Sequence, residues 1–236
     1  MRGMAEHTTH TAHAAHADPP PADSRAGRRR AQILAAARTV FLRDGHRNTR
    51  LTAVAAEAGC SVGTLYTYFA DRDALLAAVL TGVEEEMRAA GRAGAAAHHG
   101  SPSEQISATN RAYLASYREN RDVMALMEEV ALAEEQFSRQ RLHRADGFID
   151  RNTRLIGRLS DLGGVTVADP EMTAVALSAA VSRMAYLTWV DGRFPDTDET
   201  FDRLCATADQ LWLRTLGLPE TGSGTGSGTD TAEPVN

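Results

Sequence analysis

The stretch LTAVAAEAGCSVGTLYTYFADRDALL, residues 51–76, decides the fold of this chain. Its first half predicts a short helix with Ala55 on the inner face, and Gly59 then supplies a residue that adopts positive φ without steric cost. Ser61 stands where a side-chain oxygen can cap the next helix. Leu65 follows Ala55 by ten residues, a spacing that lets two helices cross closely at a short turn. The stretch therefore predicts a helix-turn-helix, a unit that places its second helix in a DNA groove.

A set of small, aromatic and basic positions in this stretch forms a recognisable pattern. The positions are Ala55, Gly59, Ser61, Gly63-Thr64-Leu65-Tyr66, Tyr68-Phe69, Arg72 and Leu75-Leu76. They resemble the DNA-binding signature of the tetracycline-repressor-like (TetR) family, over roughly residues 31–80. Two positions differ, because Arg50 stands where the family usually has a hydroxyl residue and Val62 replaces a polar or basic one. The resemblance implies an all-α protein of about nine helices, with a three-helix DNA-binding unit followed by a helical effector-binding and dimerisation domain.

Composition divides the chain into four parts. We expect a disordered arm rich in His, Ala and Pro over residues 1–24, a DNA-binding head over 25–72, a helical body over 73–217 and a disordered tail over 218–236. The head contains nine Arg and three acidic residues, a charge of +6, whereas residues 73–236 contain fifteen Arg and twenty-five acidic residues, a charge of -10. A basic head attracts a polyanion through counterion release, and an acidic body disfavours wrapping of DNA by the rest of the protein.

Apolar residues at helical spacing predict the remaining helices. One helix is expected in the head before the motif and five in the body after the helix that starts near Asp71. Their expected ranges are 31–42, 102–120, 122–135, 142–162, 171–190 and 197–216. A turn at Gly45 is expected to end the first of them.

The sequence contains no convincing motif for a metal site, a cofactor site or catalysis. Cys60 and Cys205 are too few and too far apart for a zinc site or a disulfide framework, which fits a reducing cytoplasm. We interpret Cys60 as a small apolar contact in the turn, in preference to a redox switch. The histidines of the arm, at positions 7, 10, 13 and 16, lack a rigid frame, and we expect no metal site there. No signal peptide or membrane span is expected, and an enzyme is not expected either.

The predicted DNA contacts lie on the outward arc of the second motif helix and on cations around it. We assign them to Arg28, Arg29, Arg30, Arg50, Thr52, Ser61, Val62, Gly63, Thr64, Tyr66, Thr67, Tyr68 and Arg72. The alternative for the three consecutive arginines is a solvated charge run. Base readout is expected to depend most on Thr64, Tyr66 and Thr67.

The body is predicted to hold an effector among bulky, soft and aromatic side chains, with three polar anchors. These residues are Tyr113, Tyr117, Met124, Met127, Glu128, Phe148, Asn152, Met184, Tyr186 and Trp189, with Asn110 as the third anchor. The last two helices carry small and apolar stripes that predict a two-fold four-helix dimer interface. We assign this interface to Val175, Ala176, Ala179, Ala180, Leu204, Ala208, Leu211 and Trp212. A plain core is the alternative for both sets.

These observations favour one hypothesis about function. We expect a cytoplasmic, homodimeric transcriptional repressor that binds a near-palindromic double-stranded DNA operator. A small apolar or amphipathic effector would release it from that operator. One alternative stays open: a small-molecule sensing protein whose head has weakened or lost DNA recognition, because Arg50 and Val62 depart from the pattern.

Overall fold

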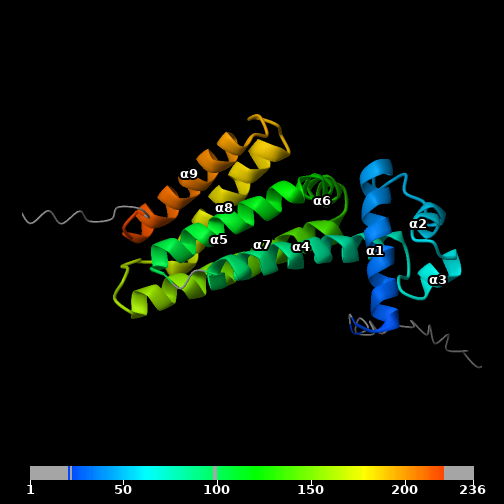
Figure 1. Ribbon diagram of the computed structural model, residues 1–236, viewed down its shortest axis with the longest axis horizontal. Coiled ribbons are helices and arrows are strands. Elements are labelled where there is room, and N and C mark those ends of the chain that lie inside the picture. Colours follow the sequence, from blue (N-terminus) through cyan, green and yellow to red (C-terminus); the bar gives the residue numbers. More distant parts are fainter. Residues whose placement is uncertain (1–20, 22, 98–99, 221–236) are drawn as a thin grey trace, which may run out of the picture.

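The computed structural model describes residues 21, 23–97 and 100–220, and every regular element within them is an α-helix. Nine helices follow one another in these residues: α1 Arg25–Asp44, α2 Leu51–Glu57, α3 Val62–Tyr66, α4 Arg72–Ala97, α5 Pro102–Glu119, α6 Arg121–Ala133, α7 Glu135–Asp161, α8 Pro170–Trp189 and α9 Asp198–Leu216. Figure 1 shows α1–α3 at one end of an elongated molecule, with α4 running from them into a bundle that contains α5–α9. The predicted all-α class is confirmed.

The first helix begins earlier than the sequence pattern predicts. Its N-cap is Ser24, whose side-chain oxygen accepts a hydrogen bond from the backbone N–H of Gly27 at 2.9 Å. The predicted start at residue 31 was therefore wrong, and the run Arg28–Arg30 lies inside the first two turns of α1. The predicted end is correct, because Gly45 adopts φ 75° and its N–H donates to the carbonyl of Phe41.

The helix-turn-helix forms as the sequence predicts. Gly59 has φ 59°, and the hydroxyl oxygen of Ser61 accepts from the backbone N–H of Thr64 at 3.1 Å. Leu65 and Phe69 turn inward, with 0% and 5% of their surfaces exposed. They join the apolar side chains of α1 and α2 in one small core. This core fixes the outward face of α3 relative to the rest of the head.

The start of α2 has no side-chain cap. Arg50 occupies the N-cap position without a capping hydrogen bond from its side chain. The hydroxyl of Thr49 does not replace it, because it donates to the carbonyl of Gly45 at 2.8 Å. The hydroxyl of Thr49 therefore stabilises the turn after α1.

Side-chain caps also start three helices of the body. Ser101 and Glu104 form a reciprocal capping box, Asp169 accepts from the N–H of Met172, and Thr197 accepts from the N–H of Thr200. The predicted ranges of these helices agree with the structure to within about two residues. The helix predicted from residue 142 instead begins at Glu135, because its first buried residue is Phe137.

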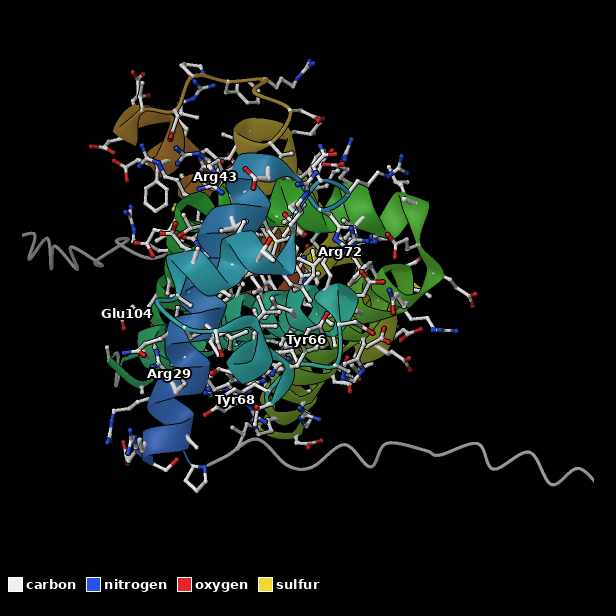
Figure 2. All side chains as sticks on the ribbon, turned by 90° about the vertical axis from the view of Figure 1, so that its right-hand side faces the viewer. Arg29, Arg43, Tyr66, Tyr68, Arg72 and Glu104 are labelled. Carbon is white, nitrogen blue, oxygen red and sulfur yellow. The ribbon has the colours of Figure 1, made fainter. Side chains whose placement is uncertain are left out.

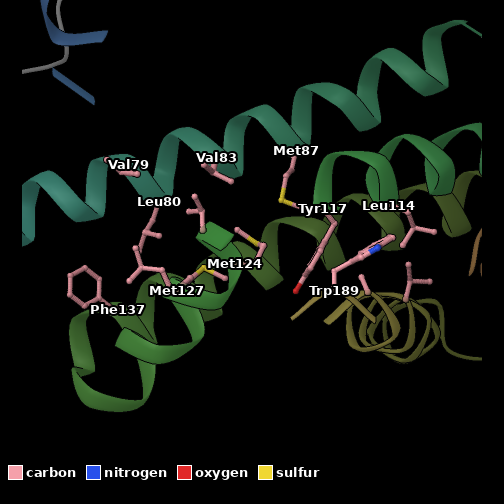
Figure 3. Packing of buried hydrophobic residues seen from close by; sticks show 14 of the residues in the cluster. Val79, Leu80, Val83, Met87, Leu114, Tyr117, Met124, Met127, Phe137 and Trp189 are labelled. Atoms are coloured by element: carbon pink, nitrogen blue, oxygen red, sulfur yellow. The ribbon is translucent and has the colours of Figure 1, made fainter. Parts of the chain in front are cut away.

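A continuous row of buried residues joins α4 to the bundle. Figure 3 shows Val79, Leu80, Val83 and Met87 of α4 along one side of this row. Met124 and Met127 of α6 and Phe137 of α7 pack beneath them, all with 2% exposure or less. Burial of this apolar surface fixes the start of α4 against α6 and α7.

Two contacts, which we call the joint, tie the head to the body. At one, Nη2 of Arg38 on α1 donates to Oδ1 of Asn120 at 2.9 Å. At the other, Nε2 of His46 lies 3.0 Å from Oε1 of Glu134, and the imidazole meets the ring of Phe137 edge-on at 5.4 Å. A movement of α6 or α7 therefore bears directly on the end of α1.

The expected dimer stripe of α9 is largely used within its own chain. Leu204, Ala208 and Trp212, three of the residues assigned to a dimer interface, are 9%, 0% and 4% exposed within the single chain. The physical reason is that α9 packs its apolar side on α5 and α8. Leu211 is 37% exposed and remains outward, and Ala176 on α8 is exposed as well.

The predicted arm and tail lie almost wholly outside the described residues, as does the histidine tract of the arm. The exceptions are residues 21, 23 and 24 of the arm and 218–220 of the tail, among which Ser24 caps α1 and Leu218 packs on the core. Gly217 ends α9 in the left-handed conformation, with φ 67°, and so turns the chain toward Leu218. None of the helices in the described part of the chain combines the length and apolarity that a membrane span requires.

Candidate nucleic-acid interface and effector cavity

The outward face of α3 presents small residues around one projecting aromatic side chain. Tyr66 is 55% exposed, and Ser61, Gly63 and Thr67 are exposed beside it. Figure 2 looks onto this end of the molecule, where Tyr66 lies between Arg72 and Tyr68 in the view. Small residues on a recognition helix allow its backbone to approach base edges and phosphates closely.

Two of the hydroxyls expected to read bases are engaged locally. The hydroxyls of Ser61 and Thr64 lie 2.9 Å apart, and that of Thr67 donates to the carbonyl of Gly63 at 3.2 Å. The lone pairs of Thr67 stay available to a donor on DNA, whereas Thr64 is only half-exposed. Val62 is half-buried and packs against the core. Tyr66 is thus the side chain of α3 best placed to reach DNA.

The predicted cations around this face differ in their exposure and in their contacts. Arg28 and Arg50 are exposed, as is Thr52 beside Arg50. Arg29 donates to Oε1 of Gln32 at 3.1 Å, and Arg30 lies over the ring of Phe69 with its Cζ 5.2 Å from the ring centroid.

Two more cations, Arg72 at the start of α4 and Arg47 in the loop after α1, contact each other. Nη1 of Arg72 donates to the carbonyl of Arg47 at 3.2 Å, while its Nε lies 3.4 Å from Asp73. Arg47 is itself exposed, and sequence reasoning missed it. Tyr68, by contrast, is half-buried against the core of the head. The cations on this side of the head can contact phosphates without leaving the fold.

The body encloses a cavity of about 320 Å³ between α5, α6, α7, α8 and α9. Six of the ten predicted effector residues line it, namely Tyr113, Tyr117, Glu128, Phe148, Asn152 and Tyr186, together with the third anchor Asn110. Its volume falls at the lower end of the range typical of small-molecule sites.

The other four predicted effector residues lie outside the lining of this cavity. Met124 and Met127 pack under α4, as described above, and Met184 is half-buried against the core. Trp189 forms a layer behind the wall, with its ring centroid 6.1 Å from that of Tyr117. Periodicity alone cannot separate a wall residue from a residue one layer deeper.

Three residues assigned to the dimer interface also line the cavity. They are Val175, Ala179 and Trp212. Small residues on α8 therefore leave room for a cavity within one chain, in addition to any close approach of a second chain.

The polar anchors connect helices across the cavity wall. The side-chain amide of Asn110 donates to Oδ1 of Asp209 at 2.9 Å, and that of Asn152 donates to Oγ of Ser178 at 2.8 Å. Burial raises the pKa of the Tyr117 phenol, and the nearby Tyr113 raises it further. Tyr117 is therefore a neutral side chain at physiological pH and can donate a hydrogen bond.

Sequence reasoning missed the arginines of the cavity wall. Arg141, Arg144, Arg151 and Arg183 line it. Arg144 is 8% exposed, and burial lowers the pKa of Arg151 despite an opposing contribution from Tyr113. A signal was present, because Arg144 and Arg151 share a face of α7 with Phe148 at a spacing of four and three residues.

One group of three side chains has the chemistry of metal ligands. His46, Asp73 and Glu134 bring one ligand atom each to within 4.8 Å of one another at the joint. The amide of Gln136 bonds to both carboxylates, at 3.3 and 3.2 Å, and His46 is within 3.5 Å of both. The contacts within the chain already account for this group as a polar link between head and body.

These features define an all-helical DNA-binding regulator with a helix-turn-helix head and a cavity-bearing body. Residues 33–79 match the family profile described as "Bacterial regulatory proteins, tetR family". The predicted resemblance is thereby confirmed at the helix-turn-helix, and regulators of this family are not enzymes. Among curated proteins no sequence relative was found.

Solved structures confirm the fold over most of the chain. A putative TetR-family regulator from Mesorhizobium loti is similar with a TM-score of 0.68 at 18% identity, covering 81% of this chain and 98% of that one. A putative TetR-family regulator from Rhodococcus sp. gives 0.65 at 24% identity, covering 78% and 97%. SmeT, the repressor of the Stenotrophomonas maltophilia multidrug efflux pump SmeDEF, gives 0.64 at 22% identity, covering 88% and 97%. At these identities the likeness describes the fold.

Proposed function

We propose that this protein is a homodimeric transcriptional repressor that leaves its operator when an effector occupies the body cavity. The observation that carries the DNA-binding part is the outward face of α3. There Tyr66, 55% exposed, projects from a head that carries a charge of +6. Two heads related by two-fold symmetry would bind successive major grooves of a near-palindromic operator.

The outward sides of α8 and α9 support the dimer. Met172 is 62% exposed and Leu211 is 37% exposed, and Ala176 between them in the sequence is exposed too. Small and apolar residues on two adjacent helices suit a four-helix interface between two copies. We expect a sedimentation mass of about twice the 25.4 kDa of the chain.

The coupling between cavity and head uses α7 and α4. The side-chain amide of Gln140 on α7 donates to the carbonyl of Ala77 and to the hydroxyl of Thr81, at 2.9 and 3.0 Å. Further along, the guanidinium of Arg151 lies against Gly91 of α4, where a Cβ would come within 3.0 Å of Nη1. An effector that moves α7 would therefore shift α4, the joint and the spacing of the two heads.

The test is a gel-shift titration with DNA that flanks the protein's own gene. We expect a sequence-preferring complex that weakens steeply with salt, because several arginines replace counterions on phosphate. An effector should weaken operator binding, and the operator should weaken effector binding by the same factor. Two independent binding events would contradict the release mechanism, and absence of any sequence-preferring complex would favour a sensing protein without DNA recognition.

A further inference from the structure

The cavity wall has an excess of positive charge. Four arginines and one glutamate line it, a formal charge of +3. Two of the arginines have acidic neighbours, since Arg141 lies 3.9 Å from Glu128 and Arg183 lies 3.8 Å from Asp191. Within the described residues, no carboxylate lies at ion-pair distance from Arg144 or Arg151.

Among these four arginines, Arg144 has buried donor atoms that lack a hydrogen-bond partner. It is 8% exposed, and its Nε and Nη1 atoms are buried without a hydrogen-bond acceptor in the described part of the chain. Its Cζ lies 5.9 Å from the ring centroid of Phe148. A buried guanidinium with unmet donors is costly, and a native structure tolerates it where a ligand supplies the acceptors.

Arg151 places a second positive charge beside the same ring in the cavity wall. Its Cζ lies 5.2 Å from the ring centroid of Phe148, so both guanidinium groups flank one ring. Its pKa is lowered first by burial and then by two further cations, Arg88 and Arg92. An anion in the cavity would relieve the desolvation and the like-charge repulsion together.

The uncharged part of the wall combines polar residues, such as Asn110 and Asn152, with an apolar and aromatic surface. Ile106, Tyr113, Tyr117, Ile149 and Leu155 supply this surface. The cavity volume of about 320 Å³ is that of about ten molecules of liquid water. The space suits a compact organic molecule with an alkyl or aryl body, in place of a bare inorganic ion.

We propose that the effector is a small amphipathic carboxylate, held by Arg144 through its charged end and by the aromatic wall through its apolar body. This inference rests on the proposed function, because it names the ligand class of the same cavity. It narrows the sequence-based expectation of an apolar or amphipathic molecule to an anion. A carboxylate oxygen is a strong, charged acceptor for a guanidinium N–H, and no such acceptor is bonded to Nε or Nη1 of Arg144 in the described part of the chain.

The test compares octanoate with octanamide, two probes that share a chain and differ in charge at pH 7. The only two tryptophans report on the cavity, since Trp212 lines it and Trp189 stacks behind Tyr117. Fluorescence titration of the full chain without DNA is expected to give octanoate at least tenfold tighter binding than octanamide. Equal binding of the two, or no binding of either at millimolar concentration, would overturn the proposal.

Variants of Arg144 test whether this side chain causes the preference for octanoate over octanamide. Arg144→Met is expected to reduce the preference for octanoate to about onefold, and measurable binding of octanamide to this variant shows that the cavity is still folded. Arg144→Gln, which keeps a polar side chain, should behave likewise if the charge is what matters. The matched control is Arg154→Met, an exposed arginine of the same helix that does not line the cavity.

The outcomes separate this inference from the proposed function. A preference for octanoate that persists in Arg144→Met would exclude Arg144 as the anion-binding group. Since these titrations contain no DNA, their failure leaves operator binding by the head untouched. Conversely, failure of the gel shift would leave the anion preference of the cavity standing.

Discussion

The head and the body both contain many arginines but place them oppositely with respect to water. In the head, Arg28 and Arg50 are exposed and remain hydrated until a polyanion arrives. In the body, Arg144 lines the cavity wall with only 8% of its surface exposed. The same residue type therefore suits two partners, because burial decides whether a cation meets a long phosphate backbone or one small anion. The predictions below test how far these two regions are separate and how they are connected.

The largest effect is expected where the two regions meet. Phe137→Ala should lower the free energy of unfolding by about 3 to 5 kcal/mol, because the ring is 1% exposed and supports both His46 and the α4 core. Urea unfolding followed by tryptophan fluorescence measures it. Leu142→Ala is the control on the same helix, 52% exposed, and should change stability by no more than about 0.5 kcal/mol. Similar effects of the two variants would mean that the joint contributes little.

The next prediction isolates the head. Tyr66→Ala should weaken operator binding by about 1 to 3 kcal/mol without a change in stability, since the side chain is 55% exposed on the outward face. Gel-shift titration at fixed salt measures the affinity. Phe194→Ala removes another exposed aromatic ring, 42% exposed, from the body and should leave DNA binding unchanged. An unaltered affinity in Tyr66→Ala would remove this residue from the DNA contacts.

The sequence predicts the head in more detail than the body for a physical reason. Gly59, Ser61 and Leu65 act through hydrogen bonds and packing within a few residues, so their spacing predicts the turn, the cap and the inward face. The helices of the body follow from local periodicity as well. The start of α1 was missed because the capping role of Ser24 lies outside the apolar pattern.

The cavity depends on contacts between residues far apart in the chain. Whether Met124 lines a cavity or packs under α4 is decided by which neighbour covers that side of α6, and no local pattern reports it. Arg144 and Arg151 were missed because charged residues on an amphipathic helix are usually solvated. Their placement among apolar residues on the face of Phe148 is the signal that could have identified them.

A third prediction contrasts the two kinds of arginine directly. Arg144→Met should raise the free energy of unfolding of the ligand-free protein by about 1 to 3 kcal/mol, because it removes a buried cation with unmet donors. Arg50→Met should stay within about 0.5 kcal/mol of the wild type and weaken DNA binding instead. Thermal and urea unfolding of both variants check this. A loss of stability in Arg144→Met would show that its packing and its contact with Phe148 outweigh its desolvation.

The smallest effect concerns the two cysteines, one in each region. Burial raises the pKa of the Cys205 thiol from an ordinary value of 9.0 to about 11, partly offset by Arg111. Cys60 lies half-buried in the turn of the helix-turn-helix. A disulfide reagent at pH 8 should therefore modify Cys60 first, while Cys205 reacts only as the body opens.

The raised pKa of Cys205 also predicts a dependence of stability on pH. The unfolded chain loses this proton at a lower pH than the folded chain, so the contribution to stability is full below about pH 9 and falls as pH rises toward about 11. Urea unfolding between pH 8 and pH 11 should show a steeper decline in the wild type than in Cys205→Ala. Equal slopes in the two proteins would mean that the thiol of Cys205 is hydrated in the folded body. Cys205 on α9 would then be as accessible to water as a residue of the head.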